Sequence, residues 1–236
     1  METFRAFTLL HAATLCAIGL ATAAAIVLAR RRAPAARANA AERALGWAYV
    51  AAWGTTYLYL NLSPLHEAAK TLPLQLCHLN ALAAALLLIT RWPPLRPIVY
   101  FWGLALSTQA LLTPALGEGP ALFPFWFFWA THGMIVGVAL YDVFALGYRP
   151  DWRGYRTACG WAALYAALVL PLDLAFGWNY GFLGTSKPDV PTLVDALGPW
   201  PQRLALIAAL VAGAMALALA PWELARRRAK AVQSPP

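Results

Sequence analysis

The sequence predicts an all-α membrane protein with seven transmembrane helices, its N-terminus outside and its C-terminus in the cytoplasm. Hydrophobic residues make up 61% of the 236-residue chain and charged residues only 12%, whereas soluble domains carry about 25% charged residues. Seven long apolar stretches follow one another, without the period-2 alternation of barrel strands. A single polytopic domain over residues 1–236 is therefore expected, because seven spans of about 20 residues leave no room for a soluble domain.

The first three helices are expected at residues 8–29, 45–62 and 73–90. The first is a continuous apolar run, and an arginine cluster follows it rather than preceding it, which favours a retained helix over a signal peptide. Proline marks the junctions of the next two, since Pro64 follows the second helix and Pro73 starts the third. Proline is tolerated in the first turn of a helix but not in its interior.

The last four helices are expected at residues 97–115, 123–146, 156–176 and 202–222. Prolines and tryptophans again collect near the expected ends, as in the aromatic belts of membrane proteins. The longest gap, residues 177–201, is rich in glycine and proline. We expect it either to fold over the mouth of the bundle as a partial lid or to serve only as a connection.

Positive charge predicts the orientation. Fourteen of the 18 Lys and Arg residues lie in every second gap between apolar stretches, in segments 30–45, 91–96, 149–156 and the C-terminal tail. Cytoplasmic loops collect Lys and Arg, so these segments are expected in the cytoplasm. The net charge of +8 is then explained by the anionic lipid surface, and nucleic acid is not expected as a partner.

Polar side chains within the apolar stretches gather in one half of the membrane. In the expected orientation, the first six helices place polar groups in the outer half, and Asp142 is the main polar residue of the inner half. The outer group comprises His11, Asn61, Gln75, Cys77, His78, Asn80, Ser107, Thr108, Gln109, Thr131, His132, Asp173, Asn179 and Tyr180. Polar residues are costly in a membrane and mark functional sites by default. A one-sided layer favours chemistry or binding over transport, which needs polar groups through the full thickness.

Cys77 and His132 are the sharpest candidates for a catalytic pair. A thiol becomes a nucleophile when a nearby base or cation stabilises its thiolate. His78 is adjacent in sequence but points about 100° away on a helix, so His132 is the better base. The alternative is that Cys77 packs as a small apolar residue and that His132 only hydrogen-bonds a neighbouring helix. A zinc site formed by these residues with His11 is weaker, because no paired-ligand spacing such as HxxxH occurs, and no metal or cofactor is expected.

Six sequence blocks resemble the YwaF-like integral membrane family. They are LPLQLCHL at 72–79, QALLTP at 109–114, FFWATHG at 127–133, LGYRP at 146–150, NYGFL at 179–183 and LGPWP at 197–201. The resemblance implies a compact helical membrane fold and a relation to a eukaryotic transmembrane phospholipid acyltransferase that uses a Cys and a His. Those two residues correspond to Cys77 and His132 here. The chain departs from the family at Gln75, where many members carry another His.

Together these features predict an integral membrane lipid-acyl enzyme of the bacterial cytoplasmic membrane, either an acyltransferase or a lipid hydrolase acting on glycerophospholipids. Cys77 is expected to be the nucleophile and His132 the general base. The residues expected to bind substrate are His78, Asn80, Gln109, Thr131, Asp173, Asn179 and Tyr180. A non-enzymatic sensor, binding or assembly protein is the alternative, since no acid is clearly placed to orient His132, and a small-molecule transporter is the third hypothesis.

Overall fold

A computed structural model of the chain describes residues 4–31, 37–63, 66–185 and 193–233, and every regular element in these ranges is helical. The elements are α1 (Leu9–Arg30), α2 (Ala40–Leu62), α3 (Ala68–Thr71), α4 (Leu76–Thr90), α5 (Leu95–Phe101), the π-helix η1 (Trp102–Ser107), α6 (Thr108–Leu112), α7 (Phe123–Phe144), α8 (Trp152–Phe176), the 3₁₀ helices η2 (Tyr180–Phe182) and η3 (Leu193–Leu197), and α9 (Gln202–Gln233). The predicted all-α class is confirmed.

Five helical stretches in the described ranges are long and apolar enough to cross a membrane. They are Leu9–Arg30, Ala68–Thr90, Phe123–Phe144, Trp152–Phe176 and Gln202–Val232. The chain is therefore a multi-pass membrane protein. The other two expected spans have less apolar counterparts: α2 carries Glu42 and Arg43 near its start, and the helix expected at 97–115 is divided into α5, η1 and α6.

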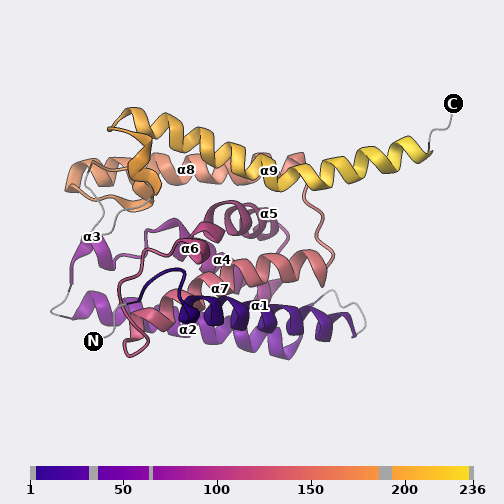
Figure 1. Cartoon of the computed structure of the whole chain (residues 1–236), viewed down its shortest axis with the longest axis horizontal. Helices are drawn as coiled ribbons and strands as arrows, with labels where there is room; N and C mark the ends of the chain where they lie inside the picture. Colours follow the sequence, from indigo (N-terminus) through magenta and orange to yellow (C-terminus); the bar gives the residue numbers. More distant parts are fainter. Residues whose placement is uncertain (1–3, 32–36, 64–65, 186–192, 234–236) are drawn as a thin grey trace.

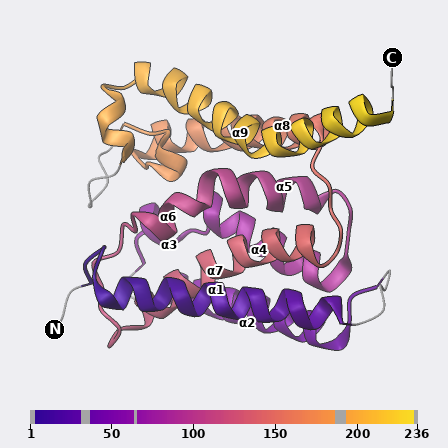
Figure 2. The same ribbon diagram turned by 45° about the vertical axis from the view of Figure 1, so that its right-hand side comes forward.

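The helices form three layers (Figures 1 and 2). The pair α8 and α9 lies along one side, α1 and α2 lie along the other, and α4, α5 and α7 lie between them. Helix α4 packs against α2, α5 and α7, while α1 packs on α7, α5 on α8, and η1 on α9. The largest buried apolar cluster joins the middle helices and includes Ala84, Leu87, Val99, Val138 and Ala139. The middle layer is thus the core to which both outer layers attach.

Helices α2 and α9 extend farthest beyond their expected ends, and α8 starts at Trp152, four residues before the expected 156. Helix α2 begins at Ala40, five residues early, because Asn39 and Glu42 form a capping box. Helix α9 continues to Gln233 instead of ending at residue 222, and its 32 residues span about 48 Å, more than the roughly 30 Å of the hydrocarbon core. Figure 1 shows its C-terminal end projecting past the other helices. The projecting turns carry the basic residues of the tail, which are good helix formers.

The helix expected at 97–115 is locally widened at its centre. In η1 the hydroxyls of Ser107 and Thr108 donate to the carbonyls of Trp102 and Gly103, five residues earlier, at 3.2 and 3.3 Å. Such π-turns are rare and often occur at functional sites. The two hydroxyls, which the sequence analysis placed in the outer polar group, thus bond the backbone of their own helix.

Candidate functional site

The position of Cys77 is set by a break in the third apolar stretch. Leu72 precedes Pro73 and has an extended backbone with ψ of 141°, as residues before proline usually do. Helix α3 therefore ends at Thr71 and α4 begins at Leu76, so Cys77 is the second residue of α4 and the predicted start at residue 73 is wrong. The first N–H groups of a helix lack intrahelical partners and carry the positive end of its dipole. The Cys77 thiol thus lies at a helix end that favours negative charge.

Side chains from other elements stabilise the break. The Tyr165 hydroxyl donates to the Leu74 carbonyl at 2.8 Å. The side-chain oxygen of Gln75 accepts from the Gly181 N–H at 3.1 Å, so Gln75 bonds the loop after α8 instead of capping α4. Irregular backbone at membrane depth persists only where protein groups or water satisfy it. The break is therefore part of the packed structure rather than a frayed helix end.

His132 extends from the middle of α7 and is only 6% exposed. Its Nδ1 lies 2.9 Å from the carbonyl oxygen of Phe128, and the two rings are in contact with centroids 4.2 Å apart. A carbonyl can only accept a hydrogen bond, so Nδ1 carries the proton and Nε2 has the free lone pair. The tautomer is therefore the one in which Nε2 can act as a base.

Cys77 and His132 lie on two helices that pack against each other, α4 and α7. Cys77 is partly buried against a cluster that contains Tyr49 of α2 and Ile135 of α7. The imidazoles of His78 and His132 are close enough to interact electrostatically. No hydrogen bond joins the Cys77 thiol to His132 in the part of the chain that the structure describes. The fold therefore places the two residues at the interface between α4 and α7, but their side chains are not hydrogen-bonded to each other.

Helix α2 adds an aromatic face that the sequence analysis missed. The Tyr49 hydroxyl donates to Thr131 Oγ1 at 3.1 Å, so Thr131, expected to bind substrate, already has a partner. Tyr57 packs against His78 with ring centroids 5.3 Å apart and against Trp53 at 4.9 Å. The spacing of these three aromatic residues, four apart along a helix, places them on one face. That spacing was the signal from which they could have been found.

Three side chains around Cys77 have buried polar atoms without a hydrogen-bond partner among the described residues. Asn80 is fully buried with both its amide nitrogen and its oxygen unpaired, and His78 Nδ1 and Trp53 Nε1 are unpaired too. Asn80 lies one turn after Cys77, on the same face of α4. Buried polar groups nearly always have partners. These atoms therefore mark the region around Cys77 as one that can bind the polar groups of a ligand or water.

The other residues expected to bind substrate are exposed or have partners of their own. Gln109 is exposed on α6. Near the C-terminal end of α8, the Asp173 carboxylate accepts the Tyr180 N–H at 3.0 Å. In the loop that follows, Asn179 accepts the Gly184 N–H at 3.0 Å. The Tyr180 hydroxyl donates to the Ala68 carbonyl, and burial raises its pKa to about 12, which keeps it protonated as a donor. Tyr180 thus connects the loop to α3, Asp173 connects it to α8, and Asn179 bonds within it. Residues 186–192, the centre of the expected lid, lie outside the described residues.

The two remaining histidines have local partners. His11 Nε2 lies 2.7 Å from the Leu111 carbonyl and its Nδ1 accepts the Phe7 N–H at 3.0 Å, so neither nitrogen is available to a metal. His66 Nδ1 lies 3.0 Å from Thr71 Oγ1. Within the described ranges, no group of three His, Cys, Asp or Glu residues could hold a metal ion.

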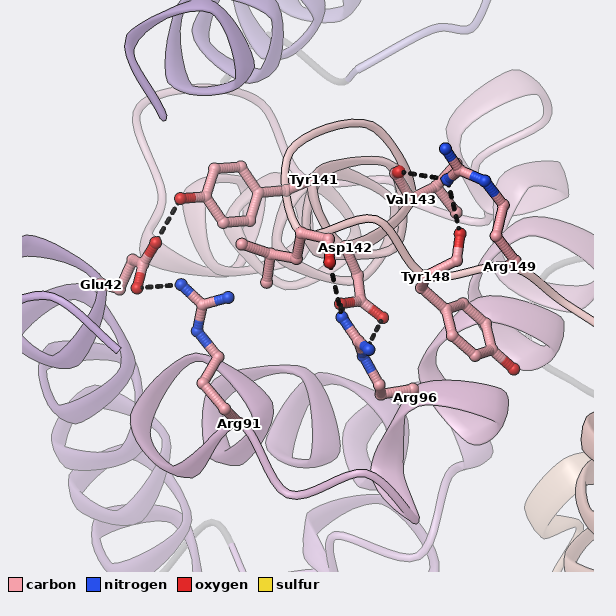
Figure 3. A network of polar contacts seen from close by, with 9 residues as sticks. Glu42, Arg91, Arg96, Tyr141, Asp142, Val143, Tyr148 and Arg149 are labelled. Carbon is pink, nitrogen blue, oxygen red and sulfur yellow. Dashed lines mark hydrogen bonds and ion pairs between the residues drawn. The ribbon is translucent and has the colours of Figure 1, made fainter. Parts of the chain in front are cut away.

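A second polar cluster lies at the other end of α4 (Figure 3). Arg96 pairs with Asp142 at 2.7 Å, Arg91 pairs with Glu42 at 2.5 Å, and Tyr141 donates its hydroxyl to Glu42. The sequence analysis singled out Asp142 but treated both arginines only as loop charges and did not consider Glu42. The presence of Glu42 within the basic segment 30–45 was the feature of the sequence that could have pointed to this ion pair. At this end of the bundle, ion pairs with arginines compensate the buried carboxylates of Glu42 and Asp142.

The TMEM164 family model matches residues 5–219 of this chain. The match includes both polar clusters and every helix up to most of α9. No curated protein and no solved structure matches the chain at a significant level.

Proposed function

The chain belongs to the TMEM164 family, and on that premise we propose that it is an integral membrane enzyme that transfers or hydrolyses the acyl groups of glycerophospholipids. Cys77 is the nucleophile and His132 the general base. The resemblance to a phospholipid acyltransferase that uses a Cys and a His supports this chemistry. A multi-pass membrane protein is also the setting in which a lipid substrate enters from the side.

The observation that carries the proposal is the position of Cys77 at the N-terminus of α4, at the interface with α7. A helix N-terminus stabilises a thiolate, which is the reactive form of cysteine. His132 supplies an imidazole whose Nε2 is free to accept a proton. Hydrogen bonds between catalytic groups are often loose before substrate binds, so the missing thiol–imidazole hydrogen bond is compatible with this role.

The proposed reaction has two steps. His132 Nε2 takes the thiol proton, Cys77 Sγ attacks the ester carbonyl, and the glycerol oxygen leaves with that proton, which forms a thioester. A lysolipid hydroxyl or water then gives its proton to His132 and attacks the thioester, and the thiol is regenerated with that proton. The unpaired amide of Asn80 is the donor we assign to the negatively charged oxygen of each tetrahedral intermediate.

We also propose that α2 and the run α5–η1–α6 cross the membrane, which gives seven crossings with the N-terminus outside. Helix α2 has 23 residues, enough to span about 30 Å of hydrocarbon. Its polar residues Glu42 and Tyr49 face partners on other helices, so lipid need not solvate them. The alternation of basic segments supports the orientation. In this arrangement the Cys77 end faces the outer leaflet.

Acyl transfer to the protein tests the proposal. Purified protein mixed with a phospholipid that carries a traceable acyl chain should acquire a label that hydroxylamine removes, because hydroxylamine cleaves thioesters. Cys77→Ala should abolish the label. His132→Ala should slow its appearance by roughly 10²–10⁴-fold, the usual contribution of a general base.

Cys159→Ala is the matched control, because Cys159 is a partly buried cysteine on α8 that packs on a different apolar cluster from Cys77. It should label like the unmodified protein. Equal labelling of Cys77→Ala and the unmodified protein would refute the assignment of the nucleophile.

A non-enzymatic lipid-binding or sensor protein is the second candidate. It is favoured by the partner of His132, which is a backbone carbonyl rather than the acid that commonly orients a catalytic histidine. This role predicts that the unmodified protein binds phospholipid but forms no thioester, and that Cys77→Ser leaves lipid binding unchanged.

A further inference from the structure

Arg203 is a buried cation without a carboxylate partner among the residues that the structure describes. It is the second residue of α9 and only 6% exposed. Its Nη2 donates to the carbonyl of Gly184, while its buried Nε has no hydrogen-bond partner. None of the ion pairs formed by residues 4–31, 37–63, 66–185 and 193–233 includes Arg203.

The partly buried arginines Arg91 and Arg96 differ from Arg203. Arg91 and Arg96 each contact a carboxylate at less than 3 Å. Removing a charge from water is costly unless an opposite charge and further hydrogen bonds compensate it. One neutral carbonyl leaves the Arg203 charge uncompensated. Asp173, which is buried in the same region, accepts the Tyr180 N–H and forms no ion pair with Arg203.

The surroundings of Arg203 connect it to the candidate site. The next residue, Leu204, packs on the same apolar cluster as Leu74, which lies in the break before α4. The loop that contains Gly184 also donates to Gln75, two residues before Cys77. Arg203 therefore lies on the Cys77 side of the protein, at the first turn of a helix that spans the membrane. Lipid phosphates lie at the depth where membrane-spanning helices begin.

We propose that Arg203 binds the phosphate of a phospholipid. Guanidinium groups match phosphate geometry with paired hydrogen bonds, and the positive end of the α9 dipole adds to the attraction. The bound phosphate supplies the missing negative charge. Insofar as this lipid is the substrate whose ester reaches Cys77, the inference rests on the proposed function, and Arg203 is then a positioning residue that fixes the headgroup.

Binding of a fluorescent phospholipid to the purified protein in detergent tests the inference. The probe is compared with a diacylglycerol of the same acyl chains, which lacks the phosphate. Arg203→Gln should weaken phospholipid binding at least about tenfold, because a hydrogen bond to a charged group is worth one power of ten or more in affinity. Diacylglycerol binding should not change. Arg153→Gln, an exposed arginine at the start of α8, is the matched control and should bind as the unmodified protein does.

Two further arms make each outcome decisive. Arg203→Lys keeps the charge and should retain part of the preference for phospholipid over diacylglycerol, even if Arg203→Gln does not fold. Inorganic phosphate at millimolar concentration should displace the probe only weakly. Equal binding of phospholipid and diacylglycerol, equal binding by Arg203→Gln, or full displacement by free phosphate would overturn the assignment to a lipid phosphate.

The same measurements in the Cys77→Ala background separate this inference from the proposed function. Binding and its dependence on Arg203 should persist there, since no covalent step is involved. If the protein is an acyl enzyme, Arg203→Gln should raise the lipid concentration for half-maximal acylation and leave the maximal rate nearly unchanged. If Cys77→Ala loses acylation but keeps Arg203-dependent lipid binding, both the acyl-enzyme function and the phosphate site are supported. If no variant, including the unmodified protein, is acylated but lipid binding is intact, only the phosphate site is supported.

Discussion

Asp142 is 1% exposed, and its carboxylate accepts three hydrogen bonds from the guanidinium of Arg96. Removal of one partner from such a pair leaves a buried charge without compensation. Arg96→Ala is therefore expected to lower the free energy of unfolding by about 3–5 kcal/mol. This change is measured by denaturant unfolding of the protein in detergent, with the loss of the helical circular dichroism signal as the readout.

Two variants control that prediction. Arg153→Ala removes an exposed arginine and should change the free energy of unfolding by no more than about 0.5 kcal/mol. Arg96→Ala combined with Asp142→Ala removes both charges and should recover most of the loss, since buried pairs replaced by apolar groups are often neutral. A double variant as unstable as Arg96→Ala would show that lost packing, not the orphaned carboxylate, is responsible.

At this scale the sequence identified individual residues better than their partners. It singled out Cys77, His132 and Asp142, because each is a polar residue in an apolar stretch. The pairing of Glu42 with Arg91 joins residues 49 positions apart, and it depends on how α2 packs against α4. No local pattern contains that information. The role of Asn179 in fixing its own loop is likewise a property of the folded backbone.

Helices α2 and α4 pack closely against each other at Gly46. A Cβ atom at this position would lie 2.6 Å from Ile89 Cγ1 and 2.8 Å from the backbone oxygen of Ala85. The backbone oxygen cannot move without shifting α4. Gly46→Ala is thus expected to destabilise the protein by about 1–3 kcal/mol through overpacking, in the same unfolding measurement.

Gly54 is the matched control on the same helix, because a Cβ there meets no atom within 4 Å. Gly54→Ala should stabilise the helix by roughly 0.5–1 kcal/mol, since alanine loses less backbone freedom on folding. If both variants shift stability in the same direction, the close approach of α2 and α4 at Gly46 is not what decides the result.

The helix boundaries show where sequence patterns are informative. Helices α1 and α7 start within one residue of expectation and end within two, because each is a continuous apolar run. The end of α9 was missed by eleven residues, because a solvent-exposed basic helix has no apolar signal. The break before α4 was anticipated as a proline junction but not as a stabilised gap, since Gly181 and Tyr165, which contact it, are about 90 or more residues away.

For the whole molecule, the proposed topology makes a prediction about each loop. A fusion of alkaline phosphatase after Gly117, in the segment between α6 and α7, should be active, because this enzyme folds only outside the cytoplasm. Green fluorescent protein fused to the C-terminus should fluoresce, because it does so only inside. These outcomes follow from the basic segments, which resist translocation.

A second fusion tests the two less apolar crossings directly. Phosphatase fused after Leu62, at the end of α2, should also be active, whereas a fusion after Gly147 should be inactive. A chain with only the five more apolar spans and the same two ends would leave the Gly117 and Gly147 fusions as predicted but would place Leu62 in the cytoplasm. An inactive fusion at Leu62 would therefore refute the seven-crossing topology.

The polar character of α2 has a consequence for how the protein is made. The helix is not among the stretches apolar enough to cross on their own, yet Glu42 and Gly46 are buried by partners from α4 and α7, and by Arg91. All of these partners emerge from the ribosome after α2. In a seven-crossing chain, α2 is therefore expected to insert stably only after α4 has been synthesised. The two helices then insert together, because α4 covers the polar face of α2 that lipid would not solvate.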